Sequence, residues 1–289
     1  MHSGWRLVSD LGLGVLRARG AQACTFLQGQ LSNDTSSVRS GQLQLSGYHT
    51  PQGRAIALLR LTALAADDLL AILPLELVPV VVARLSRFVL RAKVRITDDS
   101  AQWQILGFRG ELPRLPASAL SLPYGGARQL VLIQKTDPAA LEVGETGSRD
   151  DWVAADIAAG LPQVFLATSE AFVAQMLNLD LLGGIALDKG CYTGQEIIAR
   201  AHYRGQVKRR MQHFVSELPC ALSPGQSGML ADGRSFKVVA AVPLAAGRCE
   251  FLAVAPAAPG ADEPEAASGT QPIAVQQLPL PYELPFARP

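Results

Sequence analysis

Cysteine and charge are both scarce in this sequence. Only 4 of its 289 residues are cysteine, they lie far apart, and no two form a Cys-x-x-Cys pair. This spacing argues against a disulfide framework, a redox dithiol or a metal site built on cysteine. Lys and Arg number 26 against 25 Asp and Glu, a formal net charge of +1. The chain therefore lacks the basic excess of a protein that coats nucleic acid nonspecifically, although a local basic patch is compatible with this balance.

The sequence also lacks a long hydrophobic run. Its most apolar stretch, 69–83, is interrupted by Pro74, Glu76 and Pro79, whereas a membrane span needs about 20 predominantly apolar residues. The N-terminus MHSGWRLVSD does not show the basic-then-apolar pattern of a signal peptide. These absences predict a cytoplasmic protein that does not enter the membrane. The 48% of hydrophobic residues suffices for a core, and the length predicts two domains of about 100–200 residues each.

Strands and helices alternate in the predicted secondary structure, which favours an α+β fold over an all-β one. The predicted strands cover 11–19, 43–48, 55–61, 69–73, 94–97, 103–108 and 129–134, with a hairpin turn at 50–53. The predicted helices contain Phe26–Leu27, 74–90 and 150–159, and a further one runs from Ser169 toward Leu177. Residues 110–128 are rich in proline and glycine and are predicted to form a loop.

The pattern changes near residue 206 to short strands separated by glycine-containing turns. We therefore expect two domains, residues 1–205 and residues 206–289, and a small β-barrel in the second. Residues 255–272 combine prolines with acidic residues and are predicted to be a flexible loop.

The most informative segment is the run KGCYTGQEIIAR, residues 189–200, which we call the signature run. Thr193 and Glu196 form a Thr-x-x-Glu capping box, in which the hydroxyl accepts from one backbone N–H and the carboxylate from the other. A helix is therefore predicted to begin near Gly194 and to stop at Gly205. Gly190 and Gly194 indicate a close approach of the backbone, either to a ligand or to another strand.

The same geometry places Cys191 just before a helix N-terminus. Unpaired N–H groups, the helix dipole and the neighbouring Lys189 would favour the thiolate there, which makes Cys191 the candidate reactive thiol. The alternative is a small residue buried in a glycine-lined turn. Cys24, Cys220 and Cys249 lie in apolar contexts and are expected to be inert core residues.

Cations gather directly after the signature cysteine, and no acidic residue lies between Ile197 and Val215. The segment contains Arg200, His202, Arg204, Lys208, Arg209, Arg210 and His213. Such a group could meet a phosphate, a polyglutamate tail or RNA. A solvated face with no ligand is an equally good interpretation.

The signature run resembles the K-G-C-Y-T-G-Q-E signature, followed by an arginine, of the YgfZ family of folate-binding proteins. This family is related to the T-protein of glycine cleavage, an aminomethyltransferase. Further resemblances are spread over most of the chain, at FLQGQLSND (26–34), TPQGR (50–54), AGLP (159–162), QMLNL (175–179), GGI (183–185) and Pro281-Tyr282.

The resemblance implies a T-protein-like α+β body in two lobes, which binds folate, and a C-terminal antiparallel β-barrel. It implies tetrahydrofolate or a derivative as the cofactor. The implied function is that of an accessory protein that supports iron–sulfur cluster assembly or repair, and thereby the iron–sulfur enzymes that modify tRNA. The implied partners are folate and iron–sulfur proteins or their assembly factors, with only an indirect or weak contact to tRNA.

The resemblance also implies site residues. Trp152 matches a tryptophan of the family's folate site and would stack on a ring of the ligand, unless it is a core aromatic on an amphipathic helix. The signature run would supply further folate contacts, with an arginine near the glutamate tail and Cys191 at the mouth of the channel. These contacts are Lys189, Gly190, Tyr192, Gln195, Glu196 and Arg200.

The chain departs from the T-protein where catalysis would need carboxylates. Ala57 and Leu58 occupy the places of the T-protein's acidic pair, so aminomethyltransferase activity is not expected. Ala158 replaces a glutamate that grips the pterin, with Asp156 nearby, and Leu13 replaces an aromatic. The alternative, a folate-dependent one-carbon (aminomethyl) transferase, would need Asp34 or Asp156 as its carboxylate.

Overall fold

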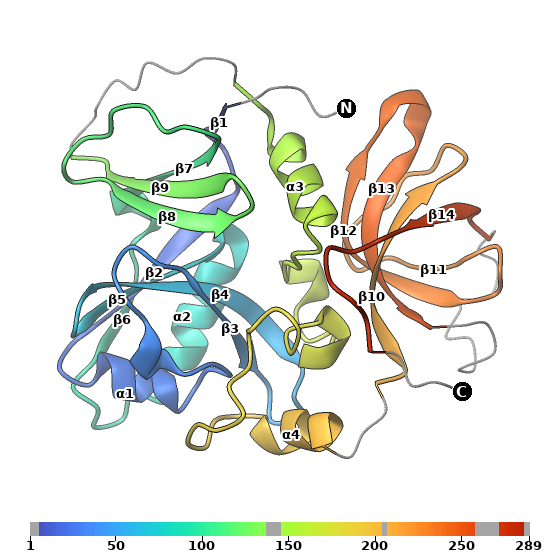
Figure 1. The fold of residues 1–289 in the computed structure, drawn as a ribbon. Helices are drawn as coiled ribbons and strands as arrows, with labels where there is room; N and C mark the ends of the chain where they lie inside the picture. The colour runs from blue at the N-terminus through green and yellow to red at the C-terminus, as the bar shows by residue number, and fades with distance from the viewer. Residues whose placement is uncertain (1–5, 137–145, 204–206, 258–271, 286–289) are drawn as a thin grey trace. The chain divides into compact units, whose positions relative to one another are not determined.

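The computed structural model describes residues 6–136, 146–203, 207–257 and 272–285. The chain divides into two compact units (Figure 1). The first unit comprises Met1–His49, Ile56–Trp152 and Gly184–Thr193, and the second comprises Thr50–Ala55, Val153–Gly183 and Gly194–Pro289. Helices and antiparallel sheets occur together in the described residues, which confirms the α+β class. The boundary expected at residue 205 falls within 204–206, outside the described residues, and the division there stays a prediction.

The first unit contains a five-stranded sheet in the order β3-β4-β5-β2-β6. Its strands are β3 (Gln44–His49), β4 (Ala55–Ala65), β5 (Asp68–Pro74), β2 (Leu13–Arg19) and β6 (Arg95–Asp98). The central strand β5 is buried throughout, as its continuous apolar run requires. Helix α2 (Val78–Ser86) contacts β6 and β2, and it buries Val78, Val81 and Leu85 at helical spacing. Helix α1 (Ala23–Gln28) follows β2.

A second sheet of the first unit has the order β1-β7-β9-β8. Its strands are β1 (Leu7–Val8), β7 (Trp103–Arg109), β9 (Arg128–Gln134) and β8 (Leu120–Gly125), and all of their pairings are antiparallel. Leu106, Phe108, Val131 and Ile133 alternate along β7 and β9 and form one apolar cluster. The alternation explains why these two strands were predictable from the sequence.

The second unit carries a five-stranded antiparallel sheet in the order β11-β12-β13-β10-β14. Its strands are β11 (Ser227–Met229), β12 (Ser235–Pro243), β13 (Cys249–Pro256), β10 (Arg209–Ser216) and β14 (Val275–Leu278). Phe214, Phe236 and Phe251 fill its core. In the described residues the order is open, and one bridge between Leu230 and Ile273 joins the two ends. A closed barrel is therefore not confirmed.

The remaining helices are short. They are α3 (Arg149–Ala158), α4 (Gln195–Tyr203) and the 3-10 turns Thr35–Ser37, Leu75–Leu77, Ser100–Gln102, Leu166–Thr168, Ala174–Leu177 and Ala245–Gly247. Helix α4 begins one residue after Gly194, close to the predicted start. The predicted end at Gly205 lies outside the described residues. No helix in the described ranges is long and apolar enough to cross a membrane.

Three secondary-structure predictions were wrong. Residues 110–128 contain the strand β8, because Leu122 and Tyr124 alternate toward the core and an edge strand tolerates Pro123. Helix α2 ends at Ser86 rather than Leu90. The helix predicted from Ser169 toward Leu177 is replaced by the short 3-10 turns on either side of residue 170. Residues 255–272 lie mostly outside the described residues, although Ala255 and Pro256 belong to β13.

Candidate functional site

Lys189 is the anchor of the signature run in the first unit. Its Nζ donates to the backbone carbonyls of Gln28, Leu31 and Asn33 at 2.7, 2.7 and 2.8 Å. An ammonium group has three N–H donors, and all three are therefore used within the protein. Burial lowers the pKa of Lys189 to about 8, and the charge of Asp34 partly offsets this effect. In this arrangement Lys189 positions the 28–33 segment and has no further N–H for a ligand.

Ser32 ties the same segment to two others. Its Oγ donates to the carbonyl of Gly184 at 2.6 Å and accepts from the Gly47 N–H at 2.8 Å. A bridge between Leu31 and Tyr48 continues the contact along β3. Residues 28–34, 44–49 and 184–192 thus form one bonded assembly, which we call the Lys189 cluster. Its sequence segments include the F-L-x-G-Q stretch and the first half of the signature run.

The Lys189 cluster contains buried polar atoms that have no hydrogen-bond partner in the protein. They are the Tyr192 hydroxyl, both ring nitrogens of His49 and Oε1 of Gln30. Burial raises the pKa of Tyr192 to about 12 and lowers that of His49 to about 4, so both side chains are neutral at neutral pH. Leaving such atoms unpaired costs free energy, which makes them candidate ligand contacts. Sequence reasoning missed His49, which no pattern marked, and Gln30, although Gln30 lies in a matched segment.

Cys191 is exposed and carries a free thiol. A Cβ built on the adjacent Gly190 would meet nothing within 4 Å, so there is open space beside the thiol. Cys249 is buried, with its Sγ donating to the Cys220 carbonyl, whereas Cys24 and Cys220 are half-buried. Exposure singles out Cys191 among the four, and its reactivity stays a prediction.

The second half of the signature run belongs to the second unit. Gln195, Glu196 and Arg200 lie on α4, and Glu196 and Arg200 are exposed and one helical turn apart. A Cβ on Gly194 would come within 2.5 Å of the Thr50 carbonyl oxygen, and Gly194 has a positive φ of 84°. The close approach predicted at Gly194 is therefore made by the 50–53 turn.

The basic residues after the signature run do not form one surface. Arg210 is buried and binds Asp180 through two hydrogen bonds of 2.7 and 3.0 Å. His213 is buried and lies 2.9 Å from Glu250, and Arg209 donates to Ser235. Arg204 lies outside the described residues.

Trp152 is buried and lies on α3, where it is the last residue of that helix that belongs to the first unit. Its ring lies 4.9 Å from the Tyr124 ring and 4.8 Å from the Arg128 guanidinium. A Cβ on Gly107 would approach the same ring within 2.5 Å. These contacts favour the core-aromatic interpretation of Trp152. Leu13, also in the first unit, instead lines a cavity of about 220 Å³ that includes Trp103.

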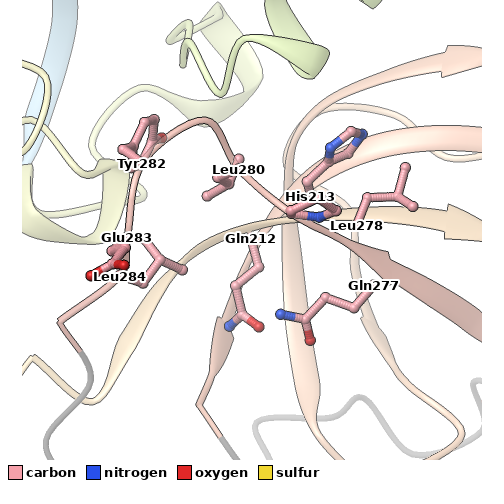
Figure 2. A pocket seen from close by; sticks show the side chains of 9 residues that line it. Gln212, His213, Gln277, Leu278, Leu280, Tyr282, Glu283 and Leu284 are labelled. Carbon is pink, nitrogen blue, oxygen red and sulfur yellow. The ribbon is translucent and has the colours of Figure 1, made fainter.

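A larger cavity, of about 320 Å³, lies in the second unit. Figure 2 shows Gln212 of β10 and Gln277 of β14 beside the chain segment that carries Tyr282 and Glu283. No residue of the signature run lines it. Within the described residues, no group of three or more His, Cys, Asp and Glu side chains could hold a metal ion.

Known proteins resemble this chain over most of its length, although no protein-family model matches. An uncharacterized protein of Haemophilus influenzae is 34% identical over 201 residues, 69% of this chain and 70% of that protein. The tRNA-modifying protein YgfZ of Enterobacter sp. strain 638 is 28% identical over 257 residues. The match covers 79% of this chain and 78% of that protein. The glycine cleavage system aminomethyltransferase T of Bartonella henselae has the same fold, with a TM-score of 0.70 over 88% of this chain and 80% of its own, at 14% identity. The chain belongs to the YgfZ family.

Proposed function

We propose that the protein is a cytoplasmic tetrahydrofolate-binding accessory protein. It would support the assembly or repair of iron–sulfur clusters, and thereby the iron–sulfur enzymes that modify tRNA. The fold shared with an aminomethyltransferase and the family name of its relatives support this proposal. The observation that carries it is the Lys189 cluster, where signature residues leave buried polar atoms without partners.

The residues of the Lys189 cluster fit a folate ring system. The hydroxyl of Tyr192 can donate to a ring nitrogen or carbonyl, and Oε1 of Gln30 can accept from a ring N–H. A Cβ on Gly190 would meet nothing within 4 Å, so the space at this glycine is open. Bound tetrahydrofolate would supply nitrogen atoms that carry a one-carbon unit. Lys189 would act as a positioning residue that holds the 28–33 segment in place.

The other predicted contacts have separate roles in this proposal. Gln195, Glu196 and Arg200 lie on α4 in the second unit, and their contact with folate stays a prediction. Trp152 would shape the first unit's core, because protein side chains surround its ring. Cys191 would present its exposed thiol to an iron–sulfur protein or an assembly factor. Contact with tRNA would be indirect or weak.

Calorimetric titration with tetrahydrofolate tests the ligand. Tyr192→Phe removes a buried hydroxyl that has no partner, so the free protein should keep its stability. The same change should weaken tetrahydrofolate binding roughly fivefold, because one ligand hydrogen bond is lost. Tyr203→Phe, at an exposed tyrosine, is the matched control and should leave the affinity unchanged. Absence of binding heat, or equal affinity of the Tyr192→Phe variant, would contradict the ligand assignment.

The thiol role is tested separately in cells. A Cys191→Ser variant should fail to restore the activity of iron–sulfur enzymes in a strain that lacks the protein. The matched control is Cys24→Ser, at a half-buried cysteine of the same unit. Full restoration by Cys191→Ser would remove the thiol from the proposal and leave the folate site untouched.

The competing function is a folate-dependent aminomethyl transferase. Ala57 and Leu58 are buried in β4, so no carboxylate lies there. The Asp34 carboxylate accepts hydrogen bonds from Ser36 and Gln28, and the Ser36 bonds hold its pKa below the usual value, which makes it a poor base. Incubation with methylene donors should yield no tetrahydrofolate above background. Enzyme-dependent tetrahydrofolate production would favour the transferase.

A further inference from the structure

The segment that joins α2 to β6 is the most basic exposed stretch of the first unit. We call residues 87–95, RFVLRAKVR, the α2–β6 loop. Arg87, Arg91, Lys93 and Arg95 are all exposed. No acidic residue occurs between Glu76 and Asp98. The charge of this loop is therefore not compensated by its own stretch of chain.

Two large apolar side chains stand among these cations. Phe88 is 54% exposed and Leu90 is 89% exposed. Single exposed apolar residues are common on protein surfaces. Here, however, an aromatic ring is flanked by arginines on both sides in the sequence, at positions 87 and 91. Cations interleaved with an exposed aromatic ring suit a ligand that offers both phosphates and flat rings.

The loop is held in place by its neighbours. The Lys93 N–H donates to Oε1 of Gln22 at 2.6 Å, and the Gln22 N–H donates back to the Lys93 carbonyl at 3.1 Å. The Phe88 N–H bonds to the Leu85 carbonyl at 2.9 Å. A loop that is already ordered loses little conformational entropy when it binds.

A further cation lies beside the loop. Arg19 of β2 is directly opposite Arg95 of β6 in the antiparallel pair. Asp68 lies 3.7 Å from Arg19, but it accepts two hydrogen bonds from Arg17, at 2.7 and 2.5 Å. Asp68 is therefore mainly committed to Arg17, and the positive charge at the edge strand β6 persists.

We propose that the α2–β6 loop binds an unpaired nucleic-acid strand. Its arginines contact successive phosphates, for which the planar guanidinium is suited. Phe88 stacks on a base, and this interaction does not depend on which base it is. The irregular backbone of the loop argues against insertion into a lipid bilayer, where backbone polar groups would lack partners. This surface shares no residue with the proposed folate site.

Fluorescence anisotropy with a labelled twelve-nucleotide oligouridine tests the proposal on the full chain. If about four cations contact phosphates, the logarithm of the affinity should fall with the logarithm of salt concentration at a slope of about −2.8. Phe88→Ala should weaken binding by about five- to a hundredfold, through lost stacking. The double variant Arg87→Gln/Arg91→Gln should reduce the slope by about 1.4, through two lost phosphate contacts.

The matched controls come from the basic stretch that follows the signature run. Tyr203→Ala removes another exposed aromatic, and Lys208→Gln another exposed cation. Both should keep wild-type affinity for the oligonucleotide. Thermal unfolding should show that every variant remains folded, because the changed side chains lie on the surface.

Four results would overturn the proposal. They are no binding of oligouridine by the wild type, equal affinity of the loop variants, equal weakening by the control variants, and equal affinity for a duplex. Binding to vesicles that contain phosphatidylglycerol, lost in Phe88→Ala while the oligonucleotide is ignored, would identify a membrane surface instead. The same loop variants should also be titrated with tetrahydrofolate. If the folate proposal fails, oligonucleotide binding should still be observed, so the two proposals can fail independently.

Discussion

Residues 87–95 and residues 200–213 are both basic stretches without a single acidic residue. Their described cations differ in environment, because the later stretch combines the exposed Arg200 and Lys208 with buried residues. In the later stretch Arg210 and His213 are buried and paired with Asp180 and Glu250. In the earlier stretch every cation from Arg87 to Arg95 is exposed.

The difference comes from the strands next to each stretch. Strand β10 lies inside its sheet, between β13 and β14, and consecutive residues along it are buried, so both of its faces are covered. A buried charge there needs a carboxylate from elsewhere in the chain. Strand β6 is at the edge of its sheet, and the loop that leads into it has no strand beyond it. A cluster of cations in a sequence thus predicts charge, whereas the strand order decides whether that charge is available to a partner.

Replacing Arg210 should lower the free energy of unfolding more than any other change considered below. In Arg210→Met, Asp180 loses its ion pair, and the Gln175 carbonyl and Asn178 Oδ1 each lose one hydrogen bond. Breaking a buried pair from one side costs about 3–5 kcal/mol. Urea denaturation should therefore show a large loss in the free energy of unfolding of Arg210→Met. A loss below about 1 kcal/mol would show that Arg210 is solvated, and the contrast between the two stretches would fail.

A buried histidine, His49, extends the comparison to pH. His49 is fully buried, which lowers its pKa from 6.5 to about 4, and its ring packs against Gly47. The unfolded chain takes up the proton near pH 6.5 and the folded chain only near pH 4. Acidification between these values should therefore destabilise the protein by about 3 kcal/mol, with no contribution from His49 above pH 7.

The matched comparison is His49→Phe against His202→Phe, at a histidine exposed on α4. Urea midpoints measured from pH 7 to pH 4 should decline less steeply in His49→Phe than in the wild type. His202→Phe should follow the wild-type decline. Parallel curves for all three proteins would mean that His49 becomes protonated without strain.

Most of the fold followed from local patterns. Strands β2, β4, β5, β7 and β9 and helix α3 lie close to their predicted positions, because each has apolar residues at the period of its element. Strand β8 was not predicted, because Pro123 and the nearby glycines are typical of a loop. Only its pairing with β9 makes this segment a strand. Helix α2 was predicted four residues too long, since the apolar residues Phe88 and Leu90 continue its spacing without facing the core.

The site was less predictable than the fold. Cys191 is exposed, and the sequence left open whether it is exposed or buried in a glycine-lined turn. The three carbonyls that bind Lys189 come from residues more than 150 positions earlier in the chain, so no local pattern reveals them. The unpaired atoms of His49 and Tyr192 arise from burial alone, which is a property of the folded chain.

The smallest change in the free energy of unfolding is expected in the exposed stretch, residues 87–95. Arg91→Gln removes one cation from a loop that also carries Arg87 and Arg95, so it should relieve repulsion and raise the free energy of unfolding slightly, by less than about 0.5 kcal/mol. The gain should shrink as salt rises from 0.01 to 1 M, because the screening length falls from about 30 Å to about 3 Å. Urea denaturation at both salt concentrations measures it, with Arg248→Gln, at an exposed arginine of the second unit, as the control. A loss above 1 kcal/mol in Arg91→Gln would mean that the protein itself uses this arginine, as it uses Arg210, and the α2–β6 loop would then have little charge left for a nucleic acid.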